Sequence, residues 1–134
     1  MNTADLTSTG IILLVVVTIA YGGTFLLKIA RADAAVNDFQ SRMFRAGHAH
    51  AGVLIVLGLL VKVLVSSEGV PAWSRAGASG VLWAAVLMPA GFFLSVLGRN
   101  PQRPNRLVAL LWVWAAVLTV GLVSAGVGLV LAGA

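Results

Sequence analysis

Four apolar stretches, each long enough to cross a lipid bilayer as a helix, limit this chain to one class of fold. They lie at about residues 9–30, 47–66, 76–98 and 107–132, and a membrane-spanning helix needs about 20 apolar residues. Of the 134 residues, 60% are hydrophobic and only 10% are charged, which is more apolar surface than a soluble domain of this size buries. We therefore predict an all-α integral membrane protein whose residues 1–134 form a single four-helix transmembrane bundle.

The lysines and arginines are concentrated in and beside two loops and predict the orientation in the membrane. These are the first and third loops, which lie on the same side of a four-span protein; their basic residues are Lys28, Arg31, Arg42, Arg45, Arg99, Arg103 and Arg106. Because basic residues in short loops mark the cytoplasmic side, we expect loops 1 and 3 to be cytoplasmic and both termini external, in a lipid environment such as a bacterial cytoplasmic membrane. The net charge of +5 reflects these loops, and without a basic aromatic platform it does not indicate nucleic-acid binding.

Two features of the last two stretches bear on packing. Pro89 removes a backbone donor from the third stretch, so we expect it either to kink that helix and widen the space beside it or to be tolerated in place. The fourth stretch has small residues at about four-residue spacing, which let helix backbones approach closely, within one protomer or between protomers. These small residues are Gly121, Ser124, Ala125 and Gly128.

The two histidines lie in the second stretch, two positions apart. At about 100° per residue, His48 and His50 point to nearly opposite sides of a helix, so they do not chelate one ion from an unbroken helix. His48 shares a polar stripe with Arg45 and Lys62, which predicts a water-contacting histidine at the membrane interface. His50 lies on the apolar side of the same helix.

An ionisable side chain in hydrocarbon is costly and marks a functional site. Neutral imidazole is also a common ligand of metals, haem iron included. A flat macrocycle needs an apolar helix face on which side chains are missing near the ligand, and the His50 side offers both. We therefore predict a haem cofactor with His50 as the iron ligand; the alternative for His50 is an interhelical hydrogen bond. The residues predicted to contact the haem are Gly47, Leu54, Leu57 and Gly58.

Two further expectations follow from a haem at the depth of His50. Its carboxylates would reach the basic side of the protein, where Arg45, Arg99 or Arg103 can pair with them. Tyr21, the only tyrosine, lies deep in the first stretch and could approach the level of His50 as a catalytic donor. A buried tyrosine hydroxyl more often bonds to a backbone carbonyl.

The segment at residues 45–58 resembles the second helix of the styrene oxide isomerases, which are small four-span bacterial membrane proteins. That family has Ala-His-Ser-Gly where this chain has Ala-His-Ala-Gly at residues 49–52, followed by a glycine that matches Gly58. The first stretch from Gly10 to the glycine pair at residues 22–23, and residues 90–94 with the Asn/Pro/Arg loop after them, also resemble the family.

The resemblance implies a homotrimer that binds haem b, with the ferric iron held by His50. In that family the iron acts as a Lewis acid on an epoxide oxygen, and a 1,2-hydride shift gives an aldehyde without net redox change. This chain differs at two positions, since Val56 and Phe93 stand where the family has asparagine and tyrosine. Those polar groups position the epoxide, and one well-placed donor contributes several kcal/mol. Isomerase activity therefore depends on these two positions, whereas haem binding does not.

Three classes of function follow from the sequence. The first is a haem b protein of the isomerase type that acts on a small apolar epoxide. The second is a haem-binding sensor, carrier or electron-transfer subunit without isomerase activity; His48 and His50 lie at nearly one depth, which disfavours a two-haem cytochrome. The third is a cofactor-free small transporter or accessory subunit.

Overall fold

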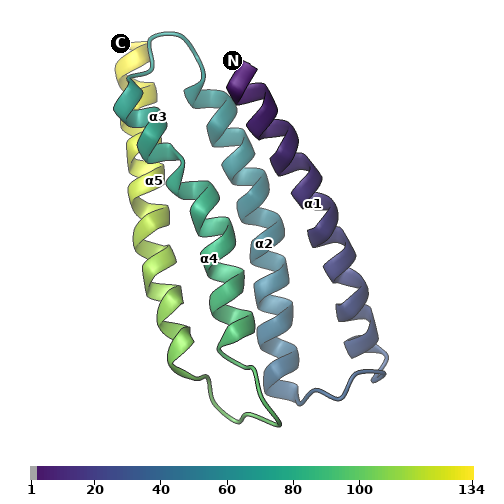
Figure 1. Ribbon diagram of the computed structural model, residues 1–134. Helices are drawn as coiled ribbons and strands as arrows, with labels where there is room; N and C mark the ends of the chain where they lie inside the picture. Colours follow the sequence, from purple (N-terminus) through teal and green to yellow (C-terminus); the bar gives the residue numbers. More distant parts are fainter. Residues whose placement is uncertain (1–2) are drawn as a thin grey trace.

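The computed structural model describes residues 3–134, except for the side chain of residue 4. Every regular element in this range is helical, and four helical spans are long and apolar enough to cross a membrane. This confirms the predicted all-α fold with four helical spans capable of crossing a membrane (Figure 1). The elements are α1 (Thr3–Ala30), α2 (Asp38–Val65), α3 (Ala72–Ala78), α4 (Gly80–Leu94), the 3-10 helix η1 (Arg106–Ala109) and α5 (Leu110–Gly133).

The second span begins at Asp38, well before the predicted boundary at residue 47. A capping box at Asn37 is the reason, because its side chain accepts from the backbone N–H of Gln40 at 2.8 Å, and the Gln40 side chain accepts from the backbone N–H of Asn37 at 3.2 Å. This polar first part of α2 has no hydropathy signal. As a result, Arg42 and Arg45 lie on the helix and not in the loop.

The third span consists of two helices, α3 and α4, which meet at Ser79. The interruption therefore lies at Ser79, and α4 continues as a helix through Pro89. The span ends at Leu94, before the predicted end at residue 98.

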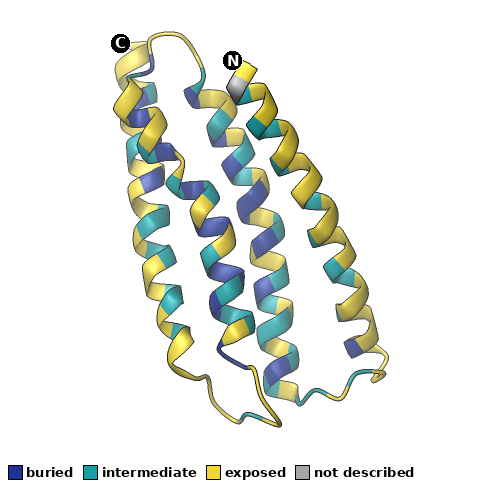
Figure 2. Cartoon of the chain, viewed as in Figure 1, coloured by how far each residue is buried: buried dark blue, intermediate teal, exposed yellow. Residues whose placement is uncertain are grey.

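The spans lie side by side in the order α5, α4, α2, α1 (Figure 1). The two central helices, α2 and α4, carry most of the buried side chains, whereas most of α1 is exposed (Figure 2). Within residues 3–134, α1 packs on α2 and makes no close backbone approach to α4 or α5. An edge helix with an apolar outer surface is suited to lipid contact.

The start of α1 and the end of α5 lie at one end of this row, and loops 1 and 3 lie at the other (Figure 1). The loops are joined by hydrogen bonds: the Asn37 side-chain amide donates to Asn100 Oδ1 and to the Pro101 carbonyl, both at 2.8 Å. Gln40 donates to the Val96 carbonyl at 3.0 Å. The two basic loops therefore lie at the same end of the bundle, as predicted for a chain with four spans.

The small residues of α5 pack within the protomer. A Cβ built on Gly121 would lie 2.8 Å from the backbone nitrogen of Val81, and one built on Gly128 would overlap Ser74. The Ser74 hydroxyl donates to the Ser124 carbonyl at 2.7 Å. These contacts bring α5 against α3 and α4, and this face is not free for another subunit.

Candidate functional site

His48 and His50 lie on opposite sides of α2, as the helical spacing predicts. His48 faces α1, where a Cβ built on Gly22 or on Gly23 would lie 3.6 Å from one of its two ring nitrogens. His50 is exposed and stacks on Phe92 of α4, with ring centroids 5.6 Å apart and an interplanar angle of 25°. The two imidazoles therefore contact different helices, His48 α1 and His50 α4.

One ring nitrogen of His50 is fixed by the backbone. Nδ1 lies 2.7 Å from the carbonyl oxygen of Ala46, one turn earlier on α2. Because a carbonyl only accepts, a neutral imidazole in this bond carries its proton on Nδ1, which leaves the lone pair of Nε2 free. Histidines that ligate metals almost always donate their other ring N–H in this way, and the bond fixes both the tautomer and the ring orientation.

Two glycines of α2 were predicted to leave open space for a macrocycle. Side chains of α4 occupy that space. A Cβ on Gly47 would lie 2.8 Å from the Phe93 ring, and one on Gly58 would lie 2.5 Å from a methyl group of Leu82. Both glycines are buried and allow α2 and α4 to pack closely. The expectation of open space at these two positions is corrected here, because bulky residues of α4 use it. Leu54 is buried and Leu57 half-buried, both in apolar clusters between the helices.

Tyr21 is not brought to His50. Its side chain is 77% exposed on α1, and α1 packs on the side of α2 that carries His48. The backbone carbonyl of Tyr21 accepts from the hydroxyl of Thr24 at 2.7 Å. Tyr21 adjoins Gly22, which packs on His48, so it lies near the level of His50 but on the opposite side of α2.

The three arginines predicted to pair with the haem carboxylates lie at the end of the molecule that holds loops 1 and 3. Arg45 is on α2 five residues before His50, and Arg99 and Arg103 are in the loop after α4. All three are exposed. Their guanidinium groups are therefore accessible to an anionic group at that end of the bundle.

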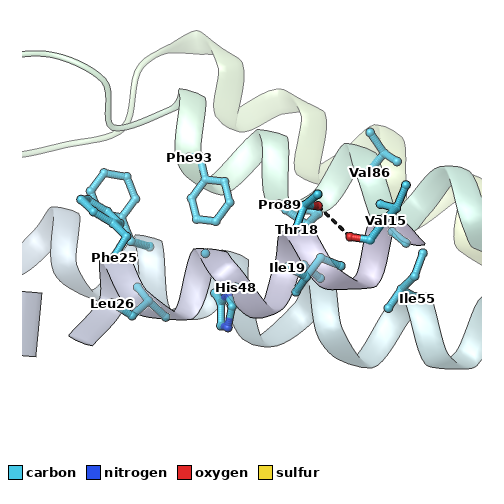
Figure 3. A pocket seen from close by; sticks show the side chains of 14 residues that line it. Val15, Thr18, Ile19, Phe25, Leu26, His48, Ile55, Val86, Pro89 and Phe93 are labelled. Carbon is cyan, nitrogen blue, oxygen red and sulfur yellow. Dashed lines mark hydrogen bonds between the residues drawn. The ribbon is translucent and has the colours of Figure 1, made fainter. Parts of the chain in front are cut away.

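A cavity of about 520 Å³ lies between α1, α2 and α4 and was not predicted from the sequence. His48 lines it (Figure 3), and the contact of this histidine with water stays a prediction. The sequence signal was the glycine pair at residues 22–23, whose missing side chains let α1 lie across the imidazole. The residues that line the cavity are Val15, Thr18, Ile19, Gly22, Phe25, Leu26, Phe44, His48, Ala51, Ile55, Ala85, Val86, Pro89 and Phe93.

Comparison of the chain with protein-family models, with curated proteins and with solved structures found no match. Within residues 3–134, no group of three or more His, Cys, Asp or Glu side chains could hold a bare metal ion. Haem iron does not require such a group, because the porphyrin nitrogens supply most of its ligands and the protein adds one or two axial side chains.

Proposed function

We propose that this chain is a haem b-binding integral membrane protein whose iron ligand is Nε2 of His50. The supporting observation is the 2.7 Å bond between His50 Nδ1 and the Ala46 carbonyl. It fixes the tautomer that a metal ligand needs and holds the ring in one orientation. The donor set therefore fits haem iron. An ionisable side chain within a membrane span is costly and marks a functional site.

The position of His50 also supports assembly of several copies. His50 is exposed, and Val53, one turn further along α2, is 67% exposed. A haem held here would lie on the outer surface of the protomer, and its far side would need cover from lipid or from a second copy. We propose a homo-oligomer, and the resemblance to styrene oxide isomerases favours a trimer. Arg45, Arg99 and Arg103, at the end with loops 1 and 3, are the proposed partners of the haem carboxylates.

We propose epoxide isomerisation as the reaction class. A bound ferric haem would supply Lewis acidity toward an epoxide oxygen. The chain's own part is to hold the ligand ring through the Ala46 carbonyl, to bind a small apolar substrate and to exclude water with apolar surface. It supplies no polar side chain at Val56, which is 63% exposed. Orientation of a substrate therefore depends on shape, and turnover should be slow.

An absorption spectrum tests the cofactor directly. The full chain, produced with a haem precursor and purified in detergent, should show a Soret band that shifts on reduction. Inductively coupled plasma mass spectrometry should find an amount of iron that is proportional to the amount of protein. A colourless, iron-free protein that is well folded would reject the proposal and leave the transporter or accessory-subunit class.

The reaction class has its own test. Haem-loaded wild-type protein is expected to convert styrene oxide to the aldehyde slowly. Val56→Asn combined with Phe93→Tyr is expected to raise the rate, chiefly through Val56→Asn, because Phe93 lines the cavity on the His48 side of α2. One positioned donor changes kcat by about 10²–10³-fold, so a gain of at least tenfold is expected if either group reaches the substrate. Free haemin in the same detergent and the double variant with His50→Ala are the controls. No gain in a double variant that still binds haem would favour the non-catalytic sensor, carrier or electron-transfer class.

A further inference from the structure

The cavity beside His48 has two ends of different chemistry (Figure 3). One end is aromatic: the ring centroids of Phe25 and Phe44 are 5.6 Å apart, and those of Phe44 and Phe93 are 5.8 Å apart. The other end is aliphatic and is formed by Val15, Ile55 and Val86. From residue 44 to residue 55, α2 rises about 16 Å at about 1.5 Å per residue. The cavity is therefore elongated along the helices, with space for a ring at one end and a chain at the other.

His48 is the lining residue with unused hydrogen-bonding capacity. No lining side chain is charged, and the hydroxyl of Thr18, the other polar one, donates to the Val15 carbonyl at 2.7 Å. Within residues 3–134, neither ring nitrogen of His48 has a hydrogen-bond partner. The His48 imidazole is half-buried, and an occupant with an oxygen acceptor beside it would accept a hydrogen bond from its ring N–H.

The cavity is accessible from the hydrocarbon. Its walls come from α1 and α4, which do not approach each other closely within the described residues. Val15 on α1 is 46% exposed and Val86 on α4 is 59% exposed. A ligand can therefore arrive laterally from the bilayer, and it must be uncharged because no lining group would balance a charge.

We propose that this cavity binds an uncharged lipid with an oxygen-bearing ring, of the prenylated or alkylated quinone type. The ring lies among the phenylalanines with its oxygen accepting a hydrogen bond from His48, and the aliphatic tail follows Val15 and Ile55. A phospholipid acyl chain fits this cavity less well, because it leaves His48 unpaired and gains nothing from the aromatic end. The site lies across α2 from His50, so it does not depend on the proposed haem.

The binding experiment uses 2,3-dimethoxy-5-methyl-6-decyl-1,4-benzoquinone as the probe and decylbenzene as the control without oxygen. The full chain in detergent is titrated with each compound, and the rise in Tm with concentration gives an apparent Kd. The quinone is expected to bind saturably and more tightly than decylbenzene. Equal affinity for the two compounds would show a plain aliphatic groove and overturn the proposal.

Three variants locate the ligand. His48→Leu is expected to weaken quinone binding by about fivefold, since a net hydrogen bond is worth about 1 kcal/mol, and His48→Gln, which keeps a donor, should weaken it less. Thr18→Phe fills the cavity from α1 and is expected to abolish binding. Its matched control is Val17→Phe, at a position that is 64% exposed and outside the cavity lining.

Two results would overturn the proposal whether or not His48→Leu folds. Unchanged quinone affinity in Thr18→Phe would place the ligand elsewhere. Loss of the Soret band in Thr18→Phe, with Val17→Phe normal, would show that the cavity holds haem. Failure of the His50 proposal alone gives a different result from failure of the quinone proposal. In that case the protein would be colourless and would still bind the quinone saturably.

Discussion

His50→Ala is expected to remove haem from the purified protein, whereas His48→Ala is expected to retain most of it. Removing a hydrogen-bond partner of a metal ligand typically costs about 10–100-fold in metal affinity, so removing the ligand itself should cost at least as much. His48 faces the opposite side of α2, against Gly22 and Gly23, and its loss only enlarges the cavity there. The measurement is the Soret absorbance per mole of protein after identical purification.

Both variants need a test that separates ligand loss from unfolding. Size-exclusion elution in detergent and the helical circular dichroism signal should match the wild type in each case. Imidazole added to His50→Ala should restore part of the haem, because it can occupy the vacated position against the Ala46 carbonyl. Equal Soret loss in both variants would reject the assignment to His50. Loss confined to His48→Ala would move the haem into the cavity.

The sequence predicted the four spans because span formation depends on a local property, the length of an apolar stretch. It missed the first part of α2 because those residues are polar and the capping box at Asn37, not hydropathy, begins the helix. The signature was present as asparagine followed three positions later by glutamine at Gln40. Hydropathy alone does not detect such a start.

Of the candidate site, the sequence predicted only those features that depend on α2 alone. The spacing of His48 and His50 fixed their opposite directions. What fills the space beside a glycine depends on the neighbouring helix: Phe93 occupies the space at Gly47, and Leu82 occupies that at Gly58. The cavity likewise requires α1 to cross α2 at the glycine pair. These contacts depend on how neighbouring helices are aligned with one another. The residues of one helix do not determine that alignment.

Gly121→Leu is expected to lower the stability of the bundle strongly. A Cβ on Gly121 would lie 2.8 Å from the backbone nitrogen of Val81 and 3.2 Å from the carbonyl carbon of Gly80. Backbone atoms cannot rotate aside as a flexible side chain can, so α5 would have to move away from α4. Overpacking a closely packed interior costs about 1–3 kcal/mol and at times more, and a leucine adds further atoms to a Cβ that already clashes.

Gly126→Leu is the matched control, because a Cβ on Gly126 meets nothing within 4 Å. Both changes remove the helix cost of glycine, about 1 kcal/mol relative to alanine, so their difference isolates the contact with α4. Thermal unfolding in detergent should give a clearly lower Tm for Gly121→Leu than for Gly126→Leu. Similar Tm values for the two variants would mean that α4 and α5 do not cross at Gly121.

Gly121→Leu should also affect the proposed iron site at His50, because α4 lies between α5 and that site. Phe92 on α4 stacks on His50 at 5.6 Å, and α4 is held between α2 and α5. If α5 is pushed away at Gly121, α4 loses support on one side, and the ring that restrains His50 becomes more mobile. Haem transfer to apomyoglobin is therefore expected to be faster from Gly121→Leu than from Gly126→Leu. A lower Tm with an unchanged transfer rate would show that the Ala46 carbonyl alone orients His50.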